Sequence, residues 1–222
     1  MRIFRLSTIA SVLLITSSVH ANLIVNGDFS LGDYGFSSQY QNNTDLYAAG
    51  VYVVGSNPHT YHAGAINFGD HTSGNGLMFM SNGSMTGDQT LWQETISVSE
   101  NTTYIFSGYV TTWGRGGSDS DPSPPALDFY INGEKQGERF IVPAPNNNWT
   151  QFSFEWDSKL DSGAVLRVVD ANLDAYGNDL SMDDLSFSAT SVSPIPEPET
   201  YALMLAGLGV VGFAARRRKQ ST

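Results

Sequence analysis

The chain has 222 residues, carries 11 Lys and Arg against 22 Asp and Glu for a formal net charge of −11, and contains no cysteine. The acidic balance argues against a nucleic-acid-binding protein, because binding to phosphates requires clustered Lys and Arg. The lack of cysteine excludes a disulfide scaffold, thiol catalysis and cysteine-ligated zinc, and an apolar share of 41% argues against an intrinsically disordered chain.

Residues 1–21 have the three parts of a secretory signal peptide. Arg2 and Arg5 supply positive charge, an apolar run extends from Leu6 to Ile15, and Val19-His20-Ala21 places small residues where signal peptidase reads them. The mature chain would then begin at Asn22. The alternative is a retained membrane anchor, but the apolar run is shorter than the ~20 residues that span a bilayer.

Residues 22–189 are predicted to form one all-β domain, because short runs of β-branched and aromatic residues alternate with clusters of Gly, Asn, Asp and Pro. Asn132-Gly133 predicts a hairpin turn. The number of short strands favours a β-sandwich of about eight or more strands. The predicted strands are Thr95–Val98, Thr103–Thr112, Leu127–Ile131, Arg139–Val142, Trp149–Trp156 and Ala164–Val169.

Three longer stretches are predicted to be irregular: Asp33–Gly50, Ser56–Asn75 and Gly114–Pro125. The last of them is too polar and too rich in Gly and Pro to be a strand. Within the second stretch, Asp70-His71-Thr72 between two glycines is interpreted as a cluster that stabilises the loop.

Three segments carry a family resemblance. They are Asn22-Leu-Ile-Val-Asn-Gly-Asp-Phe-Ser30, the central pair Trp92–Val98 and Thr103–Ser107, and Ser181-Met-Asp-Asp-Leu-Ser-Phe187. In this order they resemble the opening, central and closing strands of carbohydrate-binding-module-like jelly rolls. The resemblance covers nearly the whole domain. It implies a two-sheet jelly-roll β-sandwich, often with a structural calcium ion and sometimes with a sugar site.

The resemblance also implies that the first and last strands meet and hold the calcium ion. Strand alternation would place Asp183 on the same face as Leu185 and Phe187, so an inward-pointing Asp183 would need a cation or hydrogen-bond donors. Many family members have Glu where this chain has Ser30. The alternative is that these acids only cap turns in water. The predicted ligands of Ca²⁺ are Asn26, Asp28, Ser30 and Asp183, with Asp184 as a further acid nearby.

Glycan sites usually combine an aromatic ring with polar side chains, and Trp113 is the candidate ring. It ends a predicted strand and enters the loop Gly114–Pro125, whereas the other tryptophans lie in strand patterns that use them for packing. Polar side chains of this loop could donate to and accept from sugar hydroxyls. An alternative location is among Tyr52, His59 and Tyr61. The predicted ligand-binding residues are Trp113, Arg115, Asp119 and Asp121.

No catalytic residue is predicted. The chain has no nucleophile-elbow motif, and no acid has an apolar context that would clearly raise its pKa, as a general acid requires. His59 and His62 have an i, i+3 spacing that could present two zinc ligands on a helix, but this region is predicted to be a loop. Counting acids leaves a jelly-roll glycoside hydrolase or lyase as an alternative.

The chain ends in three consecutive features. Residues 190–199 form a Pro-rich linker with the motif Pro196-Glu197-Pro198, and residues 200–219 are predicted to form a transmembrane sorting helix with a basic tail. A helix over the apolar run Tyr201–Ala215 covers about 22 Å, which is short for a span but workable with flanking residues. The predicted membrane-anchor and stop-transfer residues are Tyr201, Leu205, Phe213, Arg216, Arg217, Arg218 and Lys219.

The order of Pro-Glu-Pro, short helix and arginine cluster resembles the PEP-CTERM sorting domain over the last part of the chain. The resemblance implies export in a Gram-negative bacterium, transient anchoring in the inner membrane and processing near the motif by an exosortase. Exosortases are membrane enzymes found with exopolysaccharide gene clusters. The alternative is a plain C-terminal anchor that is not processed.

The predicted mature part of the chain is more acidic than the whole. Six of the 11 cations lie in the two ends, which leaves five cations against all 22 acids between Asn22 and Glu199 and a net charge of −17 there. Such a surface repels polyanions and attracts divalent cations. We therefore hypothesise a non-catalytic cell-surface or matrix protein that associates with extracellular polysaccharide. The alternatives are a purely structural or adhesive matrix protein and the jelly-roll enzyme.

Overall fold

The computed structural model describes residues 21–114, 123–143, 148–174, 176–190, 204–208 and 216. The predicted signal peptide up to His20, the Pro-Glu-Pro motif and five of the predicted anchor residues, Tyr201, Phe213, Arg217, Arg218 and Lys219, lie outside this part of the chain. Residues 204–208, which include Leu205, are helical and exposed. Within the described residues, no helix is long and apolar enough to cross a membrane.

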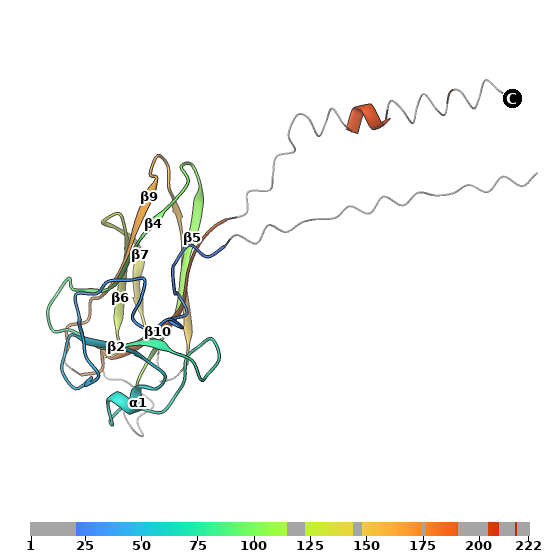
Figure 1. Cartoon of the computed structure of the whole chain (residues 1–222). Coiled ribbons are helices and arrows are strands. Elements are labelled where there is room, and N and C mark those ends of the chain that lie inside the picture. The colour runs from blue at the N-terminus through green and yellow to red at the C-terminus, as the bar shows by residue number, and fades with distance from the viewer. Residues whose placement is uncertain are drawn as a thin grey trace, which may run out of the picture. The chain divides into compact units, whose positions relative to one another are not determined.

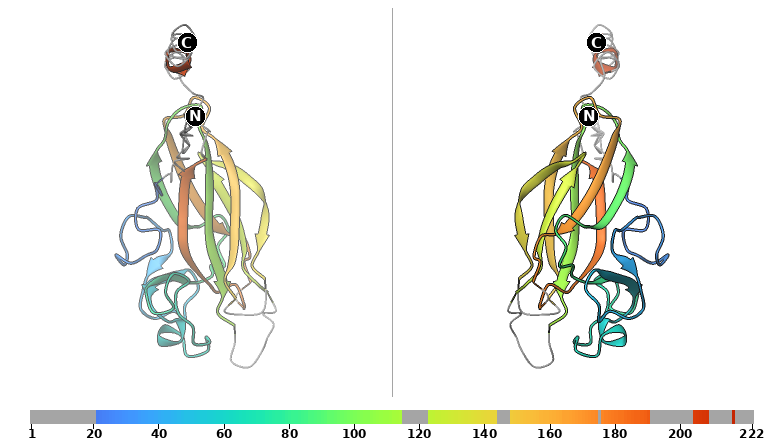
Figure 2. Two further views of the ribbon diagram at one scale, coloured as in Figure 1. Left: turned by 90° about the vertical axis from the view of Figure 1, so that its right-hand side faces the viewer. Right: turned by 90° about the vertical axis from the view of Figure 1, so that its left-hand side faces the viewer.

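The unit that ends at Thr190 is an all-β sandwich of two sheets (Figure 1). The larger sheet has the strand order β1-β2-β3-β10-β5-β8 and the smaller sheet β4-β9-β6-β7. Figure 2 shows the long strands of both sheets running in roughly the same direction. The larger sheet contains β1 (Gln41–Asn42), β2 (Val51–Gly55), β3 (Met78–Asn82), β5 (Thr103–Thr112), β8 (Thr150–Asp157) and β10 (Leu180–Ala189). The smaller contains β4 (Thr90–Ser97), β6 (Ala126–Ile131), β7 (Glu134–Ile141) and β9 (Gly163–Asp170).

The predicted strands are confirmed, most of them within one or two residues of their bounds. Strand β5 has the predicted bounds, while β4 and β7 begin five residues before the predicted ones. Asn132 and Gly133 join β6 to β7 with positive φ angles of 51° and 83°, as a two-residue hairpin turn requires. The stretch Ser56–Asn75, predicted to be irregular, contains the short helix α1 (Pro58–Tyr61).

The main core lies between the two sheets. Alternate residues of β5, namely Tyr104, Phe106 and Val110, point into it and are at most 3% exposed. Phe129 and Phe152 meet Phe106 from the facing sheet and the neighbouring strand, with ring centroids 4.4 to 6.1 Å apart. This inward-facing alternation is the pattern that a half-buried antiparallel strand needs.

A second, smaller core covers the outer face of the larger sheet. Neighbouring residues of β2 and β3 belong to different cores: Phe79 packs in the main core, whereas Met78 and Met80 pack in the second. The second core consists of Leu46, Val51, Val53, Ala65, Met78, Met80 and Trp113, with Tyr61, Phe68 and Trp149 packed against it. Strands β2 and β3 are therefore buried on both faces, which explains their nearly continuous apolar runs.

The N-terminal segment lies along β10, although it does not form the regular strand that the resemblance implied. Leu23 N–H donates to Phe187 C=O at 2.8 Å, and Leu185 N–H donates to Gly27 C=O at 2.9 Å. Positive φ angles at Asn26 (61°) and Phe29 (51°) turn the chain away from extended geometry. A Cβ at residue 27 would lie 2.0 Å from Leu185 C=O, so this close approach requires glycine.

A β-bulge interrupts β10 and corrects the prediction for Asp183. Asp183 pairs with Tyr109 and Ser186 pairs with Ser107, so Asp184 and Leu185 together oppose Gly108. Asp184 has a φ of 50°. The extra residue puts Asp183 on the outer face of the sheet, whereas Leu185 remains in the main core. The prediction that Asp183 shares the face of Leu185 and Phe187 is therefore wrong.

Trp113 should contribute strongly to stability through the second core. Its ring is 1% exposed and its Nε1–H donates to Ser181 Oγ at 3.0 Å. We expect Trp113→Ala to lower the free energy of unfolding by about 3–5 kcal/mol, measured by urea unfolding. Leu160, which is 79% exposed, supplies the control, since Leu160→Ala should change the free energy of unfolding by less than about 0.5 kcal/mol. Equal effects of the two substitutions would contradict the burial of Trp113.

Candidate functional site

A cavity of about 350 Å³ opens in the loops that connect β2 to β3. The described residues that line it are uncharged and rich in side-chain amides: Ser56, Asn57, Asn67, Phe68, Gly69, Gly74 and Asn75. Ser56, Asn67 and Asn75 are exposed, so a ligand in solution can reach the cavity. Amide groups both donate and accept hydrogen bonds, and the phenyl ring of Phe68 adds an apolar surface.

Helix α1 positions one wall of the cavity. Asn57 caps the helix, because its Oδ1 accepts from His59 N–H at 3.0 Å and Pro58 follows at the first helical position. Asn57 Nδ2 also donates to Asn67 Oδ1 at 2.9 Å. This contact uses one hydrogen of Asn57 and one lone pair of Asn67, so both amides keep further hydrogen-bonding capacity for a ligand.

Asp70 holds the loop that contributes Gly69, Gly74 and Asn75 to the cavity. Its carboxylate, on a residue that is 5% exposed, accepts from Ser73 N–H at 2.8 Å and from Gly76 N–H at 2.6 Å. A Cβ at residue 69 would lie 1.9 Å from Gly74 C=O, so the loop closes only with glycine there. The interpretation of this segment as a loop-stabilising cluster is confirmed.

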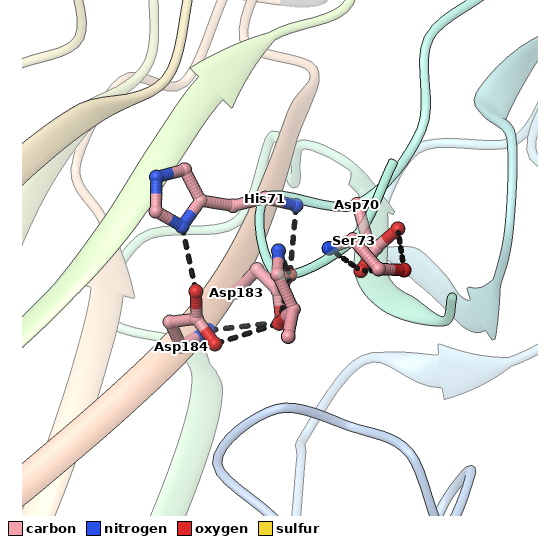
Figure 3. A network of polar contacts seen from close by, with 6 residues as sticks. Asp70, His71, Ser73, Asp183 and Asp184 are labelled. Atoms are coloured by element: carbon pink, nitrogen blue, oxygen red, sulfur yellow. Dashed lines mark hydrogen bonds and ion pairs between the residues drawn. The ribbon is translucent and has the colours of Figure 1, made fainter. Parts of the chain in front are cut away.

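The same loop is tied to the bulge of β10, as Figure 3 shows. The Asp183 carboxylate accepts from His71 N–H at 2.8 Å and from Thr72 N–H at 3.1 Å. Asp184 lies 2.6 Å from His71 Nδ1 and accepts from Thr72 Oγ1 at 2.7 Å. Two adjacent carboxylates of β10 therefore hold the backbone and side chains of residues 71 and 72.

Aromatic contacts connect this anchor to the cavity. The His71 ring stacks on Tyr109 of β5, with centroids 3.6 Å apart, and meets the Trp149 ring at 5.7 Å. Trp149 in turn contacts Phe68 edge-to-face, with centroids 6.1 Å apart. The ring of Phe68 at the cavity thus rests on side chains that the larger sheet positions.

The predicted calcium ligands are not all brought together. The Asn26 side chain holds its own turn: Oδ1 accepts from Leu31 N–H at 2.8 Å, and Nδ2 donates to Gly32 C=O and Tyr34 C=O. Asp28 Oδ1 accepts from Ser30 Oγ at 2.9 Å. Asp183 has donors from residues 71, 72 and 184, so its carboxylate is satisfied without a cation. Asp183 therefore does not fit the role of a ligand shared with Asn26 and Asp28.

Asp184 rather than Asp183 meets the N-terminal segment. A cavity of about 450 Å³ between this segment and β10 is lined by Asn22, Ile24, Asn26, Gly27, Asp28, Asp184, Leu185 and Ser186. Within the described residues, no group of three His, Cys, Asp or Glu side chains could hold a metal ion. Calcium binding in this cavity stays a prediction, with Asp28 and Asp184 as the acids that reach it.

The predicted sugar platform at Trp113 is corrected by the structure. Trp113 is buried in the second core beneath His62, so its ring offers no open face to a sugar. Arg115, Asp119 and Asp121 lie outside the described residues, and their role stays a prediction. Of the alternative residues, Tyr52 is 7% exposed and its hydroxyl donates to Asp33 Oδ1 at 2.8 Å.

Three acids have raised pKa values, which contradicts the expectation that no acid lies in such a context. Burial raises the pKa of Glu94, that of Asp170 to about 7 and that of Asp183 to about 6. All three are buried, with exposed fractions of 7%, 2% and 0%. The sequence shows their apolar neighbours, but the depth of burial depends on how the sheets pack.

The sequence analysis does not predict the cavity residues Asn57, Asn67, Phe68 and Asn75 as a site. Their signal was present, because an Asn-Pro pair marks the helix cap and asparagines recur through Ser56–Asn75. Only the fold of the loop brings residues 56 and 75 to one cavity.

Comparison with known proteins identifies the C-terminal motif. Residues 194–219 match the PEP-CTERM protein-sorting motif. No curated protein matches the chain.

Several solved structures are similar to the domain. The CBM22-1–CBM22-2 tandem domain of Xyn10C from Paenibacillus barcinonensis has 15% identity and a TM-score of 0.48. The match covers 82% of this chain and 49% of the tandem domain. The enzymatically active domain of tailspike protein 4 from bacteriophage CBA120 has 8% identity and a TM-score of 0.46. The match covers 76% of this chain and 21% of the tailspike domain. A CBM4 structure has 14% identity and a TM-score of 0.40, and the match covers 75% of this chain and 99% of the CBM4 chain. The chain thus spans about half of the first structure and about a fifth of the second.

Protonation of Asp183 should be visible in the pH dependence of stability. Its pKa is about 6 in the folded chain and about 4 in an unfolded chain, so the folded state binds the proton more tightly. The contribution of Asp183 to the free energy of unfolding is therefore greatest below pH 4 and is lost as the pH rises to about 6. We expect Asp183→Asn to reduce this decline, measured by urea unfolding across the range. If the free energy of unfolding of the Asp183→Asn variant falls with pH as steeply as that of the wild type, the raised pKa of Asp183 is contradicted.

Proposed function

We propose that the chain is an exported, exosortase-processed cell-surface or matrix protein whose jelly-roll domain associates with a neutral glycan without catalysing a reaction. The PEP-CTERM sorting motif at residues 194–219 carries the first part of this proposal, since proteins with this motif are exported and sorted to the cell surface. The transmembrane helix predicted for residues 200–219 would hold the protein in the inner membrane until exosortase acts.

The cavity between β2 and β3 supports the glycan part. Neutral sugars present many hydroxyl groups and apolar ring faces, and the cavity offers three asparagines, a serine and a phenyl ring. A cavity of about 350 Å³ lies at the lower end of the size range of small-molecule sites. It would hold a short stretch of a polysaccharide chain.

Charge favours a neutral glycan over an anionic one. The chain between Asn22 and Glu199 carries 22 acids against five cations. Lys135 and Arg139 are engaged by Asp128, and Arg167 by Asp88. Uronic acid or sulfate groups would meet repulsion without a cation in the cavity lining to offset it.

The burial of the acids argues against the enzyme alternative. A general acid needs a raised pKa and also access to substrate. The acids with raised pKa, Glu94, Asp170 and Asp183, are at most 7% exposed within the described structure. A purely structural matrix protein remains the competing function and is distinguished by a lack of glycan binding.

Sorting can be tested by replacing Pro196-Glu197-Pro198 with alanines in the native host. We expect an unprocessed form that stays in the membrane fraction, whereas the wild-type protein should lose Arg216–Lys219 on processing. Mass spectrometry of the mature C-terminus measures the difference. A wild-type mature protein that retains these four residues would contradict processing.

Glycan binding can be tested with a panel of neutral and anionic polysaccharides. We expect weak binding to a neutral member, because few hydrogen bonds form. Asn67→Ala combined with Asn75→Ala should weaken it about tenfold or more, at about 1 kcal/mol per lost bond, measured by calorimetry. Gln151→Ala, an exposed amide on β8, is the matched control and should retain full affinity. No binding, or equal losses in both variants, would reject the site.

A further inference from the structure

Polar side chains are buried where β9 ends and β10 begins. The chain runs from Asp170 at the end of β9 through Asn172 to Asn178 and Asp179, which precede β10. Asp170, Asn178 and Asp179 are 2%, 0% and 8% exposed. Groups of this kind are costly to bury unless each polar atom finds a partner.

Asp170 is satisfied at only one of its two carboxylate oxygens. Oδ1 accepts from Ala126 N–H at 3.1 Å and from Asn172 N–H at 3.0 Å. Oδ2 is buried and has no hydrogen-bond partner among the described residues. Since an ionised carboxylate has about four lone-pair sites, half of this group is left without compensation.

Asn178 presents a second unpartnered oxygen. Its Nδ2 donates to Asn172 C=O at 3.0 Å, and a carbonyl can only accept, so the orientation of the amide is determined. Oδ1 then has no partner among the residues that the structure describes. A Cβ at residue 83 would lie 2.1 Å from the Asn178 amide, so the amide rests directly on the Gly83 backbone.

Asn172 and Tyr40 place these two side chains in one region. The backbone of Asn172 binds Asp170 through its N–H and Asn178 through its C=O. Ser84, next to Gly83, donates from its N–H to the Tyr40 hydroxyl at 3.0 Å. The pKa of Tyr40 is raised by burial and then by the negative charge of Asp170, which places that charge near the hydroxyl.

Negative charge also accumulates here. Burial raises the pKa of Asp170 to about 7, and the charge of Asp179 acts in the same direction. Arg139 acts in the opposite direction, but its guanidinium is bound by Asp128 through contacts of 3.1 and 2.7 Å. The buried carboxylate of Asp170 is therefore only partly balanced by Arg139.

We propose that this end of the sandwich holds a buried Ca²⁺ ion, bound by Asp170 Oδ2 and Asn178 Oδ1, with Asp179 supplying a second negative charge. Calcium takes six to eight oxygen ligands and mixes carboxylates, amide oxygens, backbone carbonyls and water. The ligating atoms are all oxygens, a set that favours Ca²⁺ over zinc. The site lies apart from the N-terminal cavity, where Asp28 and Asp184 are the acids.

The test is thermal unfolding of the full-length chain in mild detergent, with Ca²⁺ or with EDTA. Calcium at about a hundredfold excess over the Kd should raise the Tm by about 5–10 °C. The Asp170→Asn variant should show no such rise in Tm with Ca²⁺. In EDTA this variant should melt at or above the wild-type temperature, because the substitution removes a buried charge. Asp28→Asn is the matched control at the other cavity and should keep the shift.

Titration of wild-type protein with CaCl₂ in a calorimeter gives a measurement that does not depend on a variant. One ion per chain should bind, and Asn178→Ala should weaken the affinity. The proposal is overturned if calcium neither binds nor raises the Tm of the wild type, or if Asp170→Asn keeps the full shift. It is also overturned if Asp28→Asn abolishes the shift, since the ion would then lie in the N-terminal cavity.

Discussion

The bulge in β10 is the constraint on which the rest of the structure depends. One extra residue at Asp184, opposite Gly108, lets a single strand face two environments. Leu185 and Phe187 stay in the main core, while Asp183 and Asp184 point to the loop that forms one wall of the cavity. A Cβ at residue 108 would lie 2.5 Å from Leu185 Cδ2 and 2.8 Å from Phe152 Cζ, so these core side chains would have to shift if residue 108 were not glycine.

The loop between β2 and β3 depends on burial as much as on hydrogen bonds. Long loops normally lie in solvent, yet this one covers the outer face of the larger sheet and encloses a second core. Trp113 shows how such a layer changes the role of a residue. At the end of a strand beside a polar loop it has the sequence context of an exposed platform, but the covering layer makes it a packing residue.

Local patterns predicted the regular part of the fold well. The strand Thr103–Thr112 and the turn Asn132-Gly133 follow from alternation and from the turn preferences of Asn and Gly, which are properties of neighbouring residues. The face of Asp183 could not be predicted, because strand alternation assumes no extra residue and nothing local marks the bulge. The cavity residues Asn57 and Asn75 and the buried pair Asp170 and Asn178 come together only through long-range packing.

The hydrogen bonds of β10 also determine how the domain would respond to mechanical tension. The strand pairs with β3 and β5, and Thr190 N–H still donates to Thr103 C=O where the strand ends. A pull on the chain beyond Thr190, resisted by a ligand near the loop that Asp183 and Asp184 anchor, would act along the length of β10. Sliding the strand would require many backbone hydrogen bonds to break together, so the line of force between ligand and tail would run along an inner strand of the larger sheet.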